Sequence, residues 1–129
     1  MPIEIKVLGF AALLQFVQFV LMAVPVNIQL GPKYTGGNRD EEQRATGIPG
    51  RFKRALDNHF EALILFTIAV VVVVLGNASS SITETCAWVY LAARILYVPA
   101  YASGIFLVRS LIWSVSFGAT FVMLWVALF

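Results

Sequence analysis

The sequence is poor in charged residues. Only 12% of its 129 residues are charged, whereas 60% are hydrophobic and the mean hydropathy is +0.84. A water-soluble domain carries about 25% charged residues, so this chain has too few of them to cover a soluble surface. The composition excludes a soluble globular enzyme and a disordered regulator, and it indicates an integral membrane protein.

Cysteine, histidine and net charge are also scarce. A single cysteine, Cys86, excludes a disulfide framework, and with His59 as the only histidine we expect no metal site. Nine Lys and Arg stand against seven Asp and Glu. This excess is too small for a surface that follows a phosphate backbone, so we expect no nucleic-acid partner.

Long apolar runs occupy most of the chain. A helix needs about 20 apolar residues to cross a bilayer, and the backbone of such a segment satisfies its hydrogen bonds internally only as a helix or a closed barrel. The runs lack the alternating polarity of barrel strands. We therefore predict an all-α integral membrane protein with one domain, residues 1–129, and four transmembrane helices. They are expected at about 5–30, 51–76, 83–108 and 110–129, with a loop at about 31–50.

Most basic residues lie in or beside that loop. They are Lys33, Arg39, Arg44, Arg51, Lys53 and Arg54. Lys and Arg favour the cytoplasmic side of a membrane, so this loop and the joint at Arg109 are predicted to be cytoplasmic. Both termini then lie on the non-cytoplasmic side. With no sorting signal visible, we expect a bacterial inner membrane.

Two polar stripes interrupt the apolar helices. At about 100° per residue, each set falls on one helix face. The first contains Arg51, Arg54, Asn58 and Glu61, and the second contains Tyr90, Arg94, Tyr97 and Tyr101. Charge inside a membrane helix is costly and usually marks function or an obligatory pair. Both stripes are expected to face protein, a ligand or a wet cleft rather than lipid.

Structural roles remain open for these residues. Glu61 and Arg94 could form a buried ion pair between helices, and Asn58 could hydrogen-bond to a neighbouring helix. Tyr97 and Tyr101 could fill the core with their hydroxyls bonded to a partner. The arginines at 51, 54 and 109 could act only as topology determinants.

The same side chains suit an anionic ligand that also carries an amine. Arginine binds carboxylates through two parallel hydrogen bonds, glutamate binds an ammonium group, and a nearby cation stabilises a thiolate. Glutathione has two carboxylates, one amine and one thiol. A phospholipid headgroup or another amino-acid derivative would fit as well.

A family resemblance favours glutathione. Residues 51–61, RFKRALDNHFE, resemble the Arg-x-x-Arg-Ala-x-x-Asn-x-x-Glu signature of the MAPEG family, the membrane-associated proteins in eicosanoid and glutathione metabolism. Residues 93–101 are similar to its Ala-Arg-x-x-Tyr-x-x-x-Tyr element, and Arg109 stands where the family places an arginine before the fourth helix.

The resemblance implies a homotrimer that binds glutathione between protomers near the cytoplasmic side. By position, the glutathione-binding residues would be Arg51, Arg54, Asn58, Glu61, Arg94, Tyr97 and Tyr101. Arg109 would activate the thiol as the catalytic residue. The activity implied is that of a glutathione transferase or peroxidase acting on lipophilic electrophiles or lipid hydroperoxides that arrive through the membrane lipids. The alternative is a non-enzymatic lipid-binding or scaffold protein of the same fold.

Two positions depart from the family pattern. Ala62 stands where some eicosanoid-forming members carry tyrosine. The end of the first helix, residues 26–30, lacks an arginine that some relatives use to grip a glutathione carboxylate, and Lys33 or Arg39 is the expected substitute.

Overall fold

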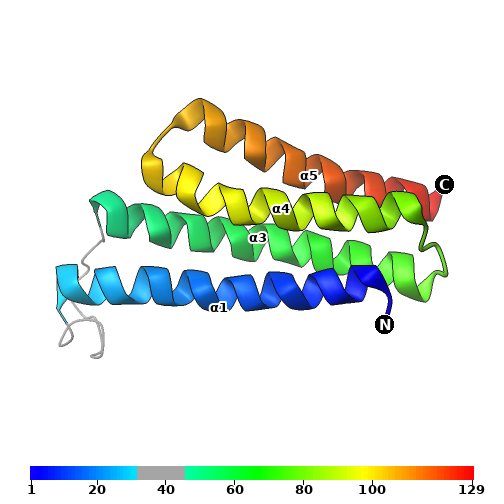
Figure 1. The fold of residues 1–129 in the computed structure, drawn as a ribbon, viewed down its shortest axis with the longest axis horizontal. Coiled ribbons are helices and arrows are strands. Elements are labelled where there is room, and N and C mark those ends of the chain that lie inside the picture. The colour runs from blue at the N-terminus through cyan, green and yellow to red at the C-terminus, as the bar shows by residue number, and fades with distance from the viewer. Residues whose placement is uncertain (32–45) are drawn as a thin grey trace.

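The described residues form a bundle of four helices that run alternately in opposite directions (Figure 1). The computed structural model describes residues 1–31 and 46–129. Its helices are α1 (Ile3–Leu30), α3 (Gly47–Leu75), α4 (Ser81–Ser103) and α5 (Phe106–Leu128), and the described residues contain no strand. Both termini lie at one end of the bundle, as expected from the sequence, and the α4–α5 corner lies at the other (Figure 1).

The second helix begins earlier than predicted. We expected it at 51–76 after a loop at 31–50, but α3 begins at Gly47, after the extended Thr46. Pro49 therefore lies in the first turn, where a missing N–H breaks no helical hydrogen bond. Most of the predicted loop, including Lys33 and Arg39, lies outside the described residues.

The third and fourth helices also differ from the predicted bounds. We expected 83–108 and 110–129, whereas α4 spans Ser81–Ser103 and α5 begins at Phe106. The Ser80 hydroxyl accepts a hydrogen bond from the Thr83 N–H, and the Thr83 hydroxyl accepts one from the Ser80 N–H, which fixes the start of α4. Gly104, with a φ of 78°, ends it. Arg109 therefore lies within the first turns of α5 rather than in the joint before it.

Three helices, α1, α3 and α5, are long and apolar enough to cross a membrane. The third predicted span, 83–108, does not meet this criterion as α4, because α4 ends at Ser103 and residues 106–108, which extended the apolar run in sequence, belong to α5. With 23 residues α4 is about 35 Å long, enough to cross a bilayer. It packs against each of the other three helices, and the charged side chain in its middle, Arg94, is fully buried.

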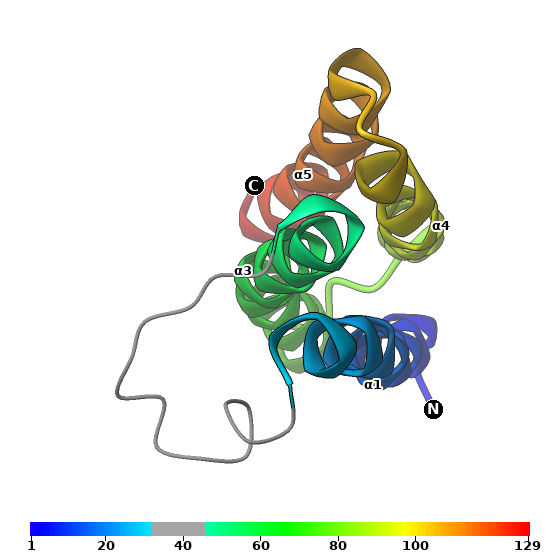
Figure 2. The ribbon, with the colours of Figure 1, turned by 90° about the vertical axis from the view of Figure 1, so that its left-hand side faces the viewer.

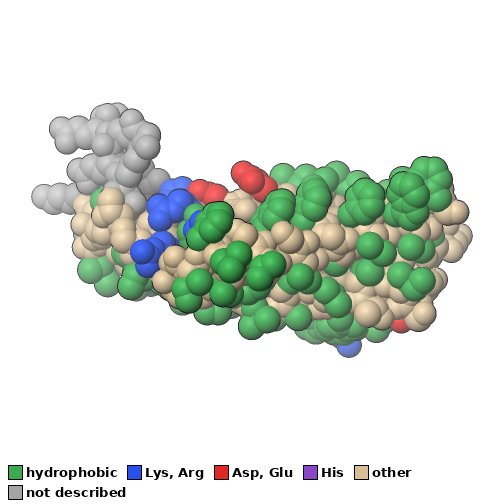
Figure 3. Space-filling view, turned by 90° about the horizontal axis from the view of Figure 1, so that it is seen from above, with side chains coloured by type: hydrophobic (Ala, Val, Ile, Leu, Met, Phe, Trp, Pro, Cys, Tyr) green, Lys and Arg blue, Asp and Glu red, His purple; other side chains and the backbone are tan. Residues whose placement is uncertain are grey.

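The bundle is open on one side. α1 packs on α3 and α4, and α5 packs on the same two helices, but α1 and α5 do not contact each other (Figure 2). Hydrophobic side chains cover much of the outer face, and Lys and Arg side chains gather toward one end of it (Figure 3). The described surface thus has the apolar exterior of a membrane protein.

The core divides the bundle into two halves. The apolar cluster lies in the half near the termini and includes Val7, Phe66, Val70, Leu91 and Met123. A polar contact closes the same end, where the buried Glu4 Oε1 accepts hydrogen bonds from Ser79 Oγ at 2.7 Å and Thr83 Oγ1 at 2.8 Å. Both predicted polar stripes therefore lie largely beyond the apolar core, in the other half.

Candidate functional site

The predicted site residues come from three helices that meet in the polar half of the bundle. The first half of α3 carries 51–61, the second half of α4 carries 94–101, and α5 carries 109 near its start. Because α3 and α4 are antiparallel, the early residues of one lie beside the late residues of the other. The structure thus brings the two sequence motifs together, in two adjoining groups.

The first group is centred on Tyr101. Arg54 Nε donates a hydrogen bond to the Tyr101 hydroxyl at 3.2 Å. The Arg109 guanidinium carbon lies 4.6 Å from the centre of the Tyr101 ring, and 5.2 Å from that of Phe106. Such a contact places a cation on the negative face of the ring. Tyr101 therefore holds two guanidinium groups from separate helices around one phenol.

The tyrosines continue the group into the bundle. The Tyr97 and Tyr101 ring centres are 5.6 Å apart, and the Arg94 guanidinium carbon lies 4.4 Å from the centre of the Tyr97 ring. Tyr97 is buried and Tyr101 half-buried. The expectation that the second stripe avoids lipid is confirmed.

Arg94 does not form the ion pair that the sequence left open. Its side chain is 0% exposed, yet Nε, Nη1 and Nη2 have no hydrogen-bond partner in the described structure. Glu61 is exposed on α3 and makes no salt bridge to it. An unpaired buried charge is expensive, and none of the described residues supplies a hydrogen-bond partner for the Arg94 guanidinium.

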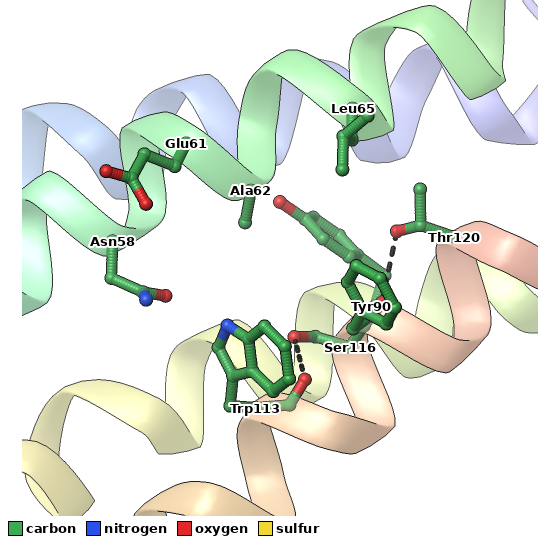
Figure 4. Close-up of a pocket in the computed structure, with 9 residues that line it drawn as sticks. Asn58, Glu61, Ala62, Leu65, Tyr90, Trp113, Ser116 and Thr120 are labelled. Carbon is green, nitrogen blue, oxygen red and sulfur yellow. Dashed lines mark hydrogen bonds between the residues drawn. The ribbon is translucent and has the colours of Figure 1, made fainter.

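The second group lines a cleft of about 150 Å³ between α3, α4 and α5. Its lining residues are Asn58, Glu61, Ala62, Leu65, Tyr90, Trp113, Ser116, Phe117 and Thr120. Figure 4 shows Asn58 and Trp113 on facing helices across this space. Asn58 Oδ1 and the Tyr90 hydroxyl are buried without a hydrogen-bond partner in the described structure. Small polar groups of a ligand could bind to them.

The α5 wall of this cleft was missed from the sequence. Trp113 and Phe117 stack with ring centres 5.0 Å apart, while Ser116 and Thr120 donate to carbonyls of their own helix, Trp113 O at 2.8 Å and Ser116 O at 3.0 Å (Figure 4). The spacing 113, 116, 117, 120 marks one helix face and is the signal that would have identified this wall.

Two further side chains, those of His59 and Arg51, form hydrogen bonds to backbone carbonyls of neighbouring helices. His59 is fully buried and its Nε2 donates to Ala11 O at 3.0 Å. This contact gives His59 a role in packing α3 against α1. Arg51 Nη1 donates to Ala102 O at 3.1 Å, so this side chain is engaged at the end of α4.

The charge balance of the site is its clearest electrostatic feature. Arg51, Arg54, Arg94 and Arg109 form no ion pair with any described residue, and the salt bridge within the described chain, Lys53 Nζ to Asp57 Oδ2 at 3.2 Å, involves none of them. Four guanidinium groups in one half of a bundle create a positive potential that favours an anion. The arrangement can therefore bind carboxylates and stabilise a thiolate.

Comparison with known proteins places the chain in one family. The sequence model of the MAPEG family matches residues 7–129, nearly the whole chain. Searches of curated proteins and of solved structures found no match.

Proposed function

Because the chain belongs to the MAPEG family, we propose that it is a membrane-bound glutathione transferase or peroxidase. The family comprises membrane proteins of glutathione-related and eicosanoid metabolism, and some of its members are not enzymes. The observation that carries the proposal for this chain is the set of arginines around Tyr97 and Tyr101 that form no ion pair with a described residue. Leaving the buried Arg94 unpaired is costly unless an anionic partner completes the site.

Glutathione supplies the groups that this site lacks. Its carboxylates would bind Arg54 and Arg94, which present N–H donors and have no acidic partner among residues 1–31 and 46–129. Its ammonium group would bind Glu61, and its peptide groups Asn58. Tyr97 and Tyr101 would complete the pocket. Each ligand group thereby meets a side chain of complementary charge.

Arg109 is the proposed activating residue. It lies on the ring of Tyr101 at the start of α5, beside the arginine proposed to bind a carboxylate. A guanidinium at this position would lower the pKa of the glutathione thiol by stabilising the thiolate, the reactive form. The proton released would leave to solvent at the same end of the bundle.

Two reactions follow from that thiolate. With an electrophilic lipophile, sulfur forms a bond to carbon, and either a leaving group departs with the bonding pair or a proton completes the addition. With a lipid hydroperoxide, sulfur bonds to the terminal oxygen and the O–O bond breaks. The departing alkoxide takes a proton to become the alcohol, and the glutathione sulfur is left as a sulfenic acid. A second glutathione then forms the disulfide and releases water. The apolar wall of Trp113 and Phe117 would face this second substrate.

The assembly proposed is a homotrimer with glutathione between protomers. Its support is the exposure of Glu61 and Arg54, polar residues on the outer surface of a helix that is apolar enough to cross a membrane. Such groups need a protein, water or ligand partner rather than lipid. We also propose that the end bearing the arginines faces the cytoplasm, because basic residues favour that side, in a bacterial inner membrane.

The direct test is calorimetric titration of the purified protein with glutathione, in detergent and in lipid nanodiscs. Binding should be accompanied by thiolate absorbance in the ultraviolet that rises with the occupancy of the site. Absence of binding in both environments would remove the proposal. The S-methyl derivative is the matched control, since it should bind without producing thiolate absorbance.

A lipid-binding protein without enzymatic activity is the second candidate. The favouring observation is an apolar groove of about 290 Å³ between α1 and α3, lined by Gln15, Phe16, Phe19, Leu56 and Phe60. An acyl chain would fit such a groove. Co-purified lipid found by mass spectrometry, together with no thiol-dependent activity across a panel of electrophiles, would favour this function over the first.

A further inference from the structure

The corner between α4 and α5 is short and sharply turned. α4 ends at Ser103, α5 begins at Phe106, and Gly104 between them has a φ of 78° and a ψ of 9°. The Gly104 N–H donates to Tyr101 O at 3.1 Å. The last carbonyls of a helix otherwise lack partners, so the remaining ones need donors from elsewhere.

Arg51 supplies such a donor from another helix. Its Nη1 donates to Ala102 O at 3.1 Å across 51 positions of sequence. The guanidinium also suits the negative end of the α4 dipole. This contact therefore ties the start of α3 to the end of α4 through charge as well as through a hydrogen bond.

The guanidinium also packs against the turn itself. A Cβ added at Gly104 would lie 3.0 Å from Arg51 Cζ and 3.1 Å from both Nη1 and Nη2. Glycine at this position thus serves two needs, because it tolerates the positive φ and leaves room for the guanidinium. Arg51 and Gly104 form one interlocked contact.

The corner controls the relative position of two proposed site residues. Tyr101 lies three residues before Gly104, and Arg109 lies five residues after it. Their side chains meet across the corner, where the Arg109 guanidinium carbon lies 4.6 Å from the centre of the Tyr101 ring. A change in the direction in which α5 leaves the corner would move Arg109 relative to the Tyr101 ring.

We propose that Arg51 is a positioning residue that fixes the α4–α5 corner, and through it the placement of Arg109 beside Tyr101. Arg51 does not grip glutathione as the sequence motif had implied. Its neighbour on the same α3 face, Arg54, reaches the Tyr101 hydroxyl instead. The two arginines of the motif therefore have different roles. Arg51 holds the backbone of the corner, and Arg54 lies in the proposed ligand site. The catalytic consequence rests on the proposed function, whereas the structural consequence does not.

The experiment compares four variants of the full-length protein in nanodiscs: Arg51→Met, Arg51→Lys, Gly104→Ala and the double variant Arg51→Met with Gly104→Ala. Methionine keeps much of the length of the side chain but has no donor, and lysine keeps one charged donor. Gly104→Ala disturbs the same contact from the other side and leaves Arg51 chemically intact. Hydrogen exchange of the amides at 104–109 measures the corner without any ligand.

We expect exchange at the corner to rise roughly tenfold in Arg51→Met, as for the loss of one charge-assisted hydrogen bond. Gly104→Ala should reproduce this rise, the double variant should add little to either change, and Arg51→Lys should recover part of the protection. Turnover should fall in Arg51→Met and in Gly104→Ala, and Arg51→Lys should retain part of it. The Kd for glutathione should change by less than about threefold, because Arg51 donates to the Ala102 carbonyl and not to the ligand.

A direct ligand role predicts a different pattern. The Kd would rise tenfold or more in Arg51→Met, corner exchange would stay at the parental rate, and Gly104→Ala would bind glutathione normally; this result overturns the proposal. If no variant binds glutathione, including the parent, the proposed function fails. The exchange pattern still decides whether Arg51 fixes the corner. Should Arg51→Met fail to fold, Gly104→Ala and Arg51→Lys decide the question by the same measurements.

Discussion

Replacing Tyr101 tests whether one phenol holds two arginines in a glutathione site. Tyr101→Phe removes the hydroxyl that accepts from Arg54 Nε at 3.2 Å but keeps the ring under Arg109. Tyr101→Leu removes the ring as well. The two substitutions therefore separate the hydrogen bond from the contact between cation and ring.

The magnitudes follow from these two contacts. Arg54 is exposed, so its hydrogen bond contributes about 1 kcal/mol, which corresponds to a roughly fivefold weaker Kd for glutathione in Tyr101→Phe. The ring contact with Arg109 contributes about 0.5–1 kcal/mol at a partly exposed position. We expect Tyr101→Leu to weaken binding roughly tenfold or more and also to reduce the thiolate yield.

Calorimetry gives the Kd, and ultraviolet absorbance of the bound thiolate gives the yield. Phe106→Leu is the matched control, because it removes the other ring near Arg109, at 5.2 Å, without touching Arg54. Its Kd should stay within about twofold of the parental value. Equal Kd values for the parent, Tyr101→Phe and Tyr101→Leu would refute the reasoning that Tyr101 organises the site.

Three further tests, one of them with a control substitution, have distinct expected outcomes. Arg109→Ala should abolish turnover with a model electrophile while glutathione binding by calorimetry persists; unchanged turnover would assign activation to another residue. Phe66→Ala removes a fully buried ring whose centre lies 3.9 Å from that of Tyr90. It should lower the free energy of unfolding by about 3–5 kcal/mol in a detergent unfolding titration. Phe121 is exposed, so the control Phe121→Ala should change this free energy by less than about 0.5 kcal/mol. Glu4→Gln weakens the hydrogen bonds from Ser79 and Thr83 at the opposite end of the bundle. It should lower the free energy of unfolding by about 1–2 kcal/mol and leave turnover per folded protein unchanged. A loss of turnover at full stability would contradict the separation of the two halves.

The helical class and the inward-facing second stripe were predictable because they depend on spacing alone, whereas Arg54 and Glu61 of the first stripe are exposed. Apolar length indicated the helices, and the period of about 3.6 residues placed Arg94, Tyr97 and Tyr101 on one face. The structure confirms that this face is turned inward. Residue type and period suffice for such a prediction, because a membrane helix cannot leave a charge in lipid at low cost.

The bounds of the last two helices were not predicted correctly, for a local reason. A charge at Arg109 was taken as a break between apolar segments, but arginine is a good helix former. The actual break is Gly104, whose positive φ and close approach to Arg51 depend on tertiary contacts. A lone glycine after a polar-aromatic stripe indicates a possible helix end, but the sequence does not show which donor stabilises it.

The pairing of individual side chains was equally beyond the sequence. Glu61 and Arg94 lie on stripes of adjacent helices, yet Glu61 is exposed while Arg94 is buried without a partner. The face that each stripe presents depends on how α3 is rotated about its axis against α4. That rotation is set by packing of the apolar half, around Phe66 and Tyr90, which periodicity does not determine.

The most direct test of the central claim is an experimental structure of the protein with bound glutathione. The account predicts the ligand between protomers in the polar half, with a carboxylate on Arg54 and the sulfur beside Arg109. Glutathione bound elsewhere, or Arg109 turned away from the sulfur, would contradict it.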